Sequence, residues 1–197
     1  MSDQLPQFFL CRHGETTWSA SGQHTGLTDL PLTDRGRENA KALGARLQGQ
    51  AFAHVFCSPL RRARETCDLA GFGDRAELDA DLVEWNYGDY EGKTTAEIRA
   101  GDPDWNVFRN GAPGGESVAA VRERADRVVA RLRSIDADSL LFSSAHFLRM
   151  LAARWLAQPA QFGQCLWLGT ASLSIVGYDH DRTEPVIRLW NCAAHLR

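Results

Sequence analysis

The sequence predicts an α/β protein, a three-layer sandwich with a mostly parallel central sheet and helices on both faces. Short apolar runs that end in polar residues alternate with segments of helical periodicity, an order typical of βαβ units. The chain has 197 residues, 44% of them hydrophobic and 24% charged, which is long enough for a sizeable core. No internal repeat or interdomain linker is evident, so residues 1–197 are expected to form a single domain.

In the first part of the chain, two buried strands are expected at residues 7–12 and 53–57, since both are apolar runs stopped by polar residues. A crossover helix between them should begin after Thr33, a candidate N-cap. It carries small or apolar residues on one face as far as Leu47.

The next segment suggests a second helix and a third strand. Pro59 directly after Ser58 suits the first helical position after an N-cap, so a helix is expected from there to about Ala70. Residues 78–84 then have the pattern of an extended segment.

Helical signals return in the middle of the chain. Thr94 and Glu97 have the spacing of a capping box for a short helix. Residues 111–115, rich in Gly and Pro, indicate a loop. A further helix is expected to begin near Glu116 or Ser117 and keeps apolar residues on one face to Leu132.

The last part of the chain contains three expected strands and one helix. A buried strand at residues 140–143 precedes a helix whose inward residues reach Trp155. Residues 172–178 and 186–190 are expected to be strands that could pair as a hairpin.

The composition excludes several classes of function. Lys and Arg number 22 against 25 Asp and Glu, a formal charge of −3, so no overall positive field favours nucleic acid or an acidic membrane as a partner. The N-terminal segment lacks the apolar stretch of a secretory signal, and a cytoplasmic location is expected. The five cysteines form no CxxC pair, which argues against a zinc ribbon or a disulfide framework.

Three of the predicted strands end in distinctive polar residues. Arg12 and His13 follow the first strand, Ser58 and Arg62 follow the second, and residues 143–146 follow a later one. Because sites in α/β sheets form at the carboxyl ends of strands, these residues are expected to share one pocket.

The Arg12-His13-Gly14 sequence suits a bound phosphate. Arg12 can hold phosphate oxygens bidentately, and Gly14 lets backbone amides approach a ligand. A neutral His13 can attack phosphorus, which divides hydrolysis into phosphorylation and dephosphorylation of the enzyme. On these residues alone, a solvated Arg-His turn is the more common outcome.

Three ordered motifs change that balance. They are RHGETTWS at residues 12–19, SPLRRARET at 58–66 and EWNYGDYEG at 84–92. Together they resemble the histidine phosphatase superfamily, whose best-known branch is phosphoglycerate mutase, and most closely its sugar-phosphate phosphatases of the sedoheptulose-bisphosphatase type. The resemblance covers essentially the whole chain and implies a phosphoglycerate mutase-like form of the sandwich.

The resemblance implies specific roles for four residues. His13 is then the nucleophile that becomes phosphohistidine, Arg12 and Arg62 clamp the transferred phosphoryl group, and Glu84 is the proton donor. The chemistry agrees, because an alkoxide leaving group needs a proton and the same carboxylate can later take one from the attacking water.

Four more residues match family positions near the phosphate or the rest of the substrate, although small polar residues and buried tyrosines are also common in turns and cores. They are Ser19, Thr25, Gly26 and Tyr87. The six tryptophans are expected to be packing residues and not a stacking platform for a ligand.

The last motif departs from the family, which has a second catalytic histidine followed by glycine. Alignment on residues 147–149 puts Ser144 and Ala145 at those positions, and His146 then matches the second histidine of a His-Gly-His variant. Losing such a hydrogen-bond donor typically costs ~10²- to 10³-fold in rate. Ser144 could donate one neutral bond. Alternatively, His146 could bend back into the catalytic position, which would disturb the register of the following helix.

The leading hypothesis is a metal-independent phosphomonoesterase without a cofactor, acting on small phosphorylated metabolites such as sugar phosphates, with activity lowered by Ser144. A non-catalytic protein that binds or senses phosphorylated metabolites is the alternative. A phosphoglycerate mutase is less favoured, because residues 91–115 look shorter than the substrate-enclosing insertion of the mutases. No clustered metal ligands are apparent, and a homo-oligomer is left open.

Overall fold

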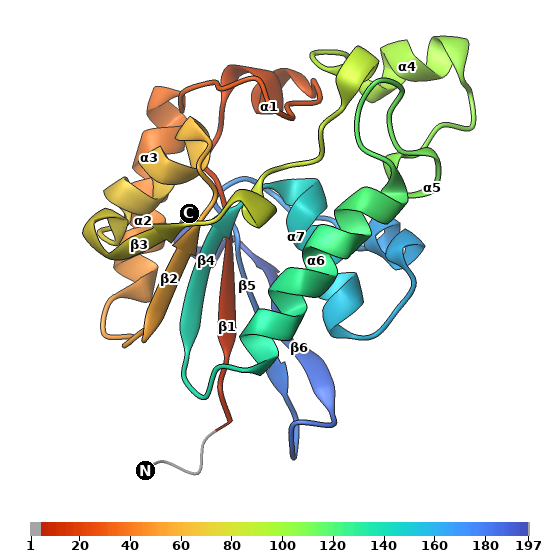
Figure 1. Ribbon diagram of the computed structural model, residues 1–197. Coiled ribbons are helices and arrows are strands. Elements are labelled where there is room, and N and C mark those ends of the chain that lie inside the picture. Colours follow the sequence, from red (N-terminus) through yellow and green to blue (C-terminus); the bar gives the residue numbers. More distant parts are fainter. Residues whose placement is uncertain (1–4, 197) are drawn as a thin grey trace.

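The computed structural model describes residues 5–196 and is built around one six-stranded sheet (Figure 1). The strand order is β3-β2-β4-β1-β5-β6. The strands are β1 Phe8–Arg12, β2 His54–Cys57, β3 Ala76–Leu78, β4 Ser139–Ser143, β5 Leu173–Tyr178 and β6 Pro185–Cys192. Strands β3, β2, β4 and β1 pair in parallel, whereas β5 is antiparallel to β1 and to β6. The predicted α/β class and the hairpin are both confirmed.

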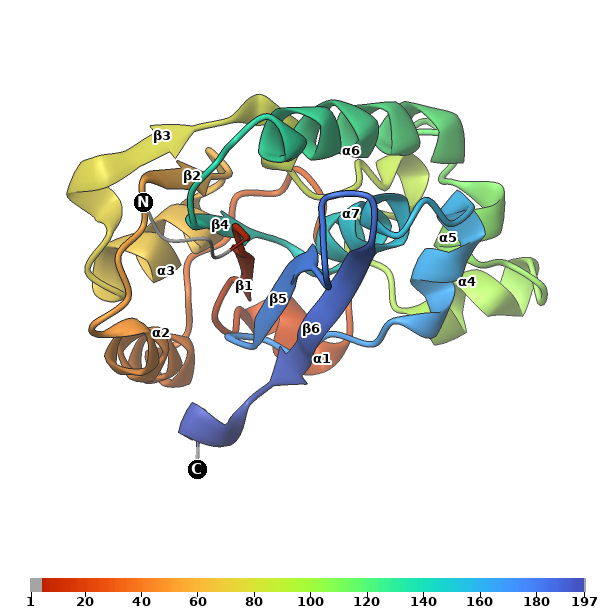
Figure 2. The same cartoon turned by 90° about the horizontal axis from the view of Figure 1, so that it is seen from below.

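Helices cover both faces of the sheet (Figures 1 and 2). The helices are α1 Thr17–Ser21, α2 Asp34–Leu47, α3 Arg61–Leu69, α4 Thr95–Gly101, α5 Val107–Asn110, α6 Val118–Arg133 and α7 Ala145–Trp155. In β1, Phe8 and Leu10 belong to the core cluster that α6 and α7 share, while Phe9 and Cys11 pack with α2 and α3. This alternation is the period of two expected for a strand buried on both sides.

Three helices begin where the sequence predicts, two of them at predicted caps. The side chain of Thr33 accepts a hydrogen bond from the N–H of Gly36, and Ser117 caps α6 in the same way. Thr94 and Glu97 form a reciprocal capping box at α4. Each cap satisfies an N–H group that has no partner inside its helix.

The predicted start of α3 is wrong. The helix begins at Arg61, and its N-cap residue Leu60 is extended and makes no side-chain cap. Ser58 Oγ instead accepts a long 3.4 Å bond from the N–H of Leu60, and Asp29 Oδ1 accepts from the N–H of Arg61 at 2.6 Å. A carboxylate from a distant loop therefore caps this helix, and Pro59 lies in the turn before it.

The third strand is also displaced from its predicted range, 78–84. It spans Ala76–Leu78, and residues 80–82 form a 3₁₀ turn. The turn forms because the Asp79 carboxylate accepts from the N–H of Asp81 at 2.9 Å. Leu82 is fully buried there, so its apolar character reflects packing of a turn.

The helices α1 and α5 are short and were not predicted. Among the described residues, no helix is both long enough and apolar enough to cross a lipid bilayer.

Candidate active site

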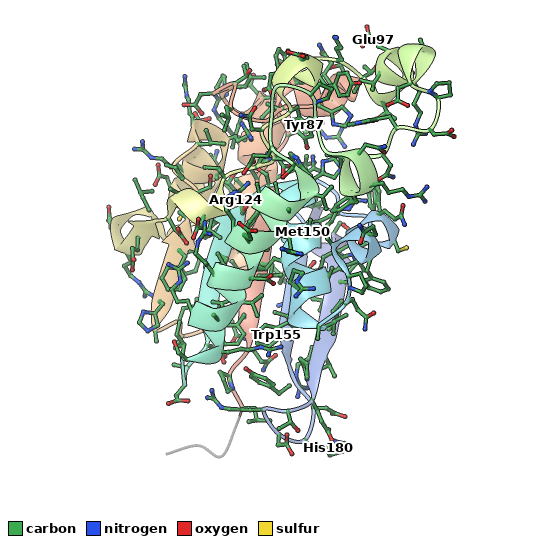
Figure 3. The ribbon with its side chains drawn as sticks, turned by 45° about the vertical axis from the view of Figure 1, so that its right-hand side comes forward. Tyr87, Glu97, Arg124, Met150, Trp155 and His180 are labelled. Carbon is green, nitrogen blue, oxygen red and sulfur yellow. The ribbon has the colours of Figure 1, made fainter. Side chains whose placement is uncertain are left out.

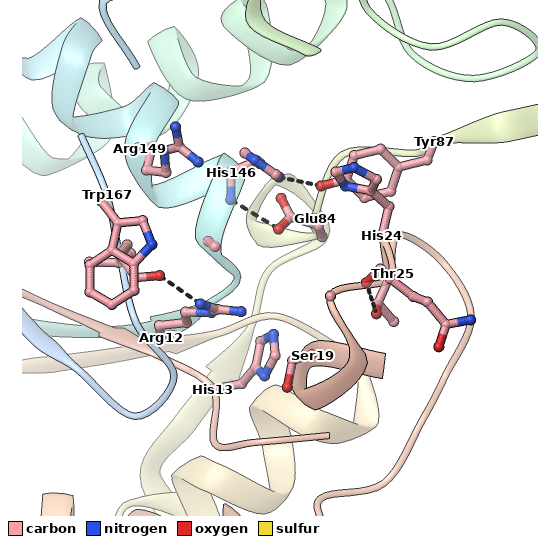
Figure 4. A pocket seen from close by; sticks show the side chains of 14 residues that line it. Arg12, His13, Ser19, His24, Thr25, Glu84, Tyr87, His146, Arg149 and Trp167 are labelled. Carbon is pink, nitrogen blue, oxygen red and sulfur yellow. Dashed lines mark hydrogen bonds between the residues drawn. The ribbon is translucent and has the colours of Figure 1, made fainter. Parts of the chain in front are cut away.

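A cavity of about 180 Å³ opens at the carboxyl ends of β1 and β4 (Figure 4). Eight of the eleven predicted site residues line it: Arg12, His13, Ser19, Thr25, Glu84, Tyr87, Ala145 and His146. Arg62, Gly26 and Ser144 lie outside its wall and are buried. The segments that follow β1 and β4 therefore meet in one pocket, whereas Ser58 after β2 is buried and does not line it.

His13 lies directly after β1 and is 4% exposed. Its Nδ1 lies 2.7 Å from the carbonyl oxygen of Gly14. Because a carbonyl only accepts, Nδ1 carries the proton and Nε2 keeps its lone pair. Burial, and then the charges of Arg62 and Arg12, hold the pKa of His13 well below its ordinary value. The imidazole is therefore neutral at pH 7.

Gly14 serves packing. A Cβ atom at Gly14 would lie 2.5 Å from the carbonyl oxygen of Gly36, in the first turn of α2. Its N–H donates to Thr66 Oγ1 at 2.9 Å. The missing side chain thus lets the loop after β1 lie against α2, and the expected approach of backbone to a ligand is not what requires this glycine.

Arg12 ends β1 and points into the cavity. Its Nη1 donates to the carbonyl of Leu168 at 2.6 Å, and its buried Nε makes no hydrogen bond within residues 5–196. Burial lowers the pKa of the guanidinium to about 10, so the side chain is still charged at pH 7.

Arg62 is completely buried in α3. Its Nη1 and Nη2 donate to the carbonyl oxygens of Thr25, Gly26 and Thr28 at 2.8–3.1 Å. Its Nε has no partner in the described part of the chain. Gly26 therefore holds Arg62 through its backbone carbonyl oxygen. The N–H of Gly26 donates to Glu91 at 2.8 Å.

Glu84 lines the cavity and is 4% exposed. Its carboxylate accepts from the backbone N–H groups of Trp85, His146 and Phe147 at 2.8–3.0 Å. The last two belong to the first turn of α7, whose N–H groups have no partner inside the helix. The helix N-terminus thus fixes the direction of this carboxylate.

Tyr87, His146 and His24 form the wall of the cavity that lies across from Arg12 (Figure 4). The Tyr87 hydroxyl hydrogen-bonds His146 Nδ1, and the rings of His24 and Tyr87 lie 4.8 Å apart. Burial lowers the pKa of His24 to about 4 and that of His146 well below its ordinary value. Both histidines are therefore neutral hydrogen-bonding groups at pH 7.

Ser144 occupies the N-cap position of α7, and its buried hydroxyl makes no hydrogen bond in the region described. Strand β4 ends at Ser143, opposite Arg12, and Leu148 and Trp155 are fully buried. This geometry matches the ungapped alignment, which puts Ser144 at the position of the second catalytic histidine. His146 does not bend back to that position and instead bonds Tyr87. Ser19 lines the cavity, but its hydroxyl is bonded to the Thr16 backbone in the cap of α1.

Six lining residues were not among the predicted site residues: Gly22, Gln23, His24, Arg149, Trp167 and Leu168. Arg149 donates from Nε to Gly163 O at 3.0 Å and lies over the Phe108 ring. Its place beside residues 147–148 in the last motif was the available signal, but arginines on helices are commonly exposed. Trp167 contradicts the expectation that all tryptophans pack, because it is 70% exposed.

Metal-ligating geometry occurs elsewhere. Of the described residues, Asp179, His180 and Glu184 form the one group of three potential ligands, and all are exposed. They belong to the β5–β6 connection, at the far end of the molecule from Tyr87 (Figure 3).

The fold and pocket define a class of protein. It is an α/β sandwich in which a neutral histidine lies within the influence of two arginines, one at the end of β1 and one in α3, and such a site suits phosphoryl transfer. Residues 8–193 match the sequence pattern of the histidine phosphatase superfamily (branch 1). The chain therefore belongs to this superfamily. An acid phosphatase and a sedoheptulose 1,7-bisphosphatase among its relatives identify the chain as a phosphatase.

Individual relatives match over most of their length. An acid phosphatase of Mycobacterium tuberculosis is 44% identical over 88% of this chain and 87% of its own. Sedoheptulose 1,7-bisphosphatase of Saccharomyces cerevisiae is 34% identical over 96% of this chain and 80% of its own length. A solved open-reading-frame product from Mycobacterium tuberculosis superposes with a TM-score of 0.90 at 40% identity, covering 95% of this chain and 98% of that one.

Proposed function

We propose that this chain is a metal-independent phosphomonoesterase that hydrolyses small phosphorylated metabolites, sugar phosphates among them, through a phosphohistidine on His13. The observation that carries the proposal is the bond from His13 Nδ1 to the carbonyl of Gly14, which leaves the lone pair on Nε2 of a neutral imidazole near Arg12 and Arg62. The activities named for the acid phosphatase and sedoheptulose 1,7-bisphosphatase relatives support the substrate class.

In the first step, His13 Nε2 forms a bond to phosphorus as the bond to the leaving alkoxide breaks, and Glu84 gives the leaving oxygen a proton. In the second step, water attacks phosphorus, the bond to His13 breaks, and Glu84 takes the proton from the water. Arg12 Nε has no partner among the described residues and is a donor for the phosphoryl oxygens, whose charge spreads in the transition state. Arg62, buried outside the cavity wall, contributes its positive charge.

Ser144 lowers the rate in this proposal. It stands where the family has its second catalytic histidine, and it offers one short, neutral hydroxyl. Removing one preorganised donor to a transition-state oxygen costs ~10²- to 10³-fold. Since His13, Arg12, Arg62 and Glu84 are all present, turnover is reduced and not lost.

The test is phosphate release from a panel of sugar phosphates and a chromogenic phosphomonoester, run in chelator. We expect slow turnover by the wild type and background rates for His13→Ala. Ser144→His should be faster by up to ~10²-fold, and Ser144→Ala should be slower than wild type because it lacks the hydroxyl.

Other outcomes separate the alternatives. If only Ser144→His turns over, the wild type is a protein that binds phosphorylated metabolites without hydrolysing them. If phosphoglycerate is isomerised faster than it is hydrolysed, the protein is a mutase. Activity that survives His13→Ala, or that chelator abolishes, contradicts the proposed chemistry.

A further inference from the structure

Trp167 is an exposed aromatic side chain at the mouth of the catalytic pocket. Its side chain is 70% exposed, more than the other exposed large hydrophobic residues, Leu27, Leu78 and Phe162, which do not line the pocket. Figure 4 shows the indole beside Arg12, across the cavity from His24 and Thr25. The flat apolar face therefore borders the space that a leaving group must occupy.

The backbone that carries this indole is fixed by long-range hydrogen bonds. Trp190 Nε1 donates to the carbonyl of Trp167 at 2.7 Å, and the N–H of Gly169 donates to Asn191 Oδ1 at 2.7 Å. Between them, the carbonyl of Leu168 accepts from Arg12 Nη1 at 2.6 Å. The segment that presents the indole also holds a phosphate-binding arginine, so the position of the indole relative to the phosphoryl site is set in advance.

The two histidine rings in the cavity wall are polar and uncharged. One ring nitrogen of His24 bonds to Thr95 Oγ1 and one of His146 bonds to Tyr87. The second nitrogen of each ring has no partner in the part of the chain that the structure describes. Arg149 likewise uses Nε and Nη2 on backbone carbonyls and keeps Nη1 free there. The cavity thus combines one flat apolar face with several hydrogen-bonding groups opposite it.

We propose that Trp167 is a stacking platform for the leaving group and makes the enzyme prefer phosphomonoesters whose leaving group contains a ring. This inference rests on the proposed function. A ring laid on the indole removes two apolar faces from water and gains dispersion contacts, whereas an acyclic leaving group covers little of that face. Aromatic rings and the C–H face of a sugar ring share this chemistry.

The experiment compares kcat/KM for an aryl phosphate, a pyranose 6-phosphate and glycerol phosphate. Trp167→Ala should lower kcat/KM about tenfold for at least one ring substrate, mainly through KM, and change glycerol phosphate by less than about twofold. Trp167→Phe should retain most of the preference. Leu78→Ala removes an exposed hydrophobic side chain distant from the pocket and should change nothing.

A selective loss with the aryl or the pyranose substrate supports the platform and identifies which ring it accepts. Equal losses on all three substrates, or no loss on either ring substrate, overturn it. Each comparison is repeated with Ser144→His, so that slow wild-type turnover does not hide the effect. If no substrate turns over in either background, the proposed function fails and the platform fails with it; turnover without ring preference contradicts the platform alone.

Discussion

Arg62 is fully buried, yet none of its described hydrogen bonds goes to a carboxylate. Its guanidinium donates to the carbonyl oxygens of Thr25, Gly26 and Thr28. Its Nε has no partner among residues 5–196. Burial lowers the pKa of this guanidinium, and the negative charges of Glu84, Asp29 and Glu91 offset that effect only in part. A bound phosphate dianion adds further negative charge beside Arg62, so we expect the ligand to stabilise the folded protein.

Inorganic phosphate or vanadate should therefore raise Tm. At about 100 times its Kd, a ligand contributes about 2.7 kcal/mol, which corresponds to roughly 5–10 °C for a chain of this size. Arg62→Met should abolish most of the shift. Arg61→Met, which changes an exposed neighbour, should keep it, and an unchanged Tm in the wild type would contradict the assignment of Arg62.

Sequence predicts single residues best where a motif carries the chemistry. Arg12, His13 and Glu84 come from such motifs and lie in one pocket. The partners of Arg62 could not be predicted, because they are backbone oxygens of a loop distant in sequence. Trp167 gave no signal either, since an exposed tryptophan has the same sequence appearance as a buried one.

At the scale of elements, α6 and the segment before it hold Glu84 in place. Arg124 of α6 donates to the carbonyl oxygens of Asp81, Val83 and Glu84 at 2.7–3.4 Å. It also pairs with Glu116 at 2.8 Å. Arg124 does not itself line the cavity and bonds the backbone carbonyl of Glu84, so it is a positioning residue for the catalytic carboxylate.

Arg124→Gln should lower the free energy of unfolding by about 3–5 kcal/mol, because it leaves Glu116 without its partner in a mostly buried site. It should also lower kcat by about 10²-fold through displacement of Glu84. KM should stay nearly constant, since Arg12 and Arg62 are untouched.

Arg122→Gln is the matched control on the exposed side of α6 and should change stability by less than about 0.5 kcal/mol. Arg124→Lys should recover part of the lost kcat. Equal kcat for Arg124→Gln and wild type would rule out the positioning role.

The elements that sequence predicts well are those with local signals. The N-caps Thr33, Thr94 and Ser117 bond to N–H groups in the next turn, so the sequence contains both partners. The start of α3 depends on Asp29, which lies far away along the chain, and the local Ser58-Pro59 signal was misleading.

At the scale of the whole molecule, the sheet assembles the site. Arg12 pairs with Ser143 across β1 and β4, and this places His13 beside the start of α7. The alternation of strands and helices predicts the α/β class. It does not determine the strand order, since strand order depends on contacts between residues far apart in the chain.

Three neutral histidines near the pocket make stability depend on pH. In the unfolded chain each binds a proton near pH 6.5, whereas burial lowers the pKa of His24 to about 4 and holds the pKa values of His13 and His146 well below the ordinary value. Between about pH 6.5 and 4 the unfolded state binds more protons, so stability must fall as the pH falls.

The free energy of unfolding in urea should therefore decrease between pH 7 and pH 5, by up to ~1.4 kcal/mol per pH unit for each such histidine. His24→Asn should reduce this slope by the share of one group. A free energy that is equal at the two pH values would show that these histidines are not held neutral.

The most direct test of the phosphatase chemistry is to trap the phosphorylated enzyme. Wild-type protein turning over a phosphomonoester is quenched in alkali, which preserves phosphohistidine, and its peptides are analysed by mass spectrometry. We expect one phosphoryl group, labile in acid, on the peptide that contains His13, and none in His13→Ala. Turnover without this modification, or a phosphoryl group on another residue, would contradict His13 as the nucleophile.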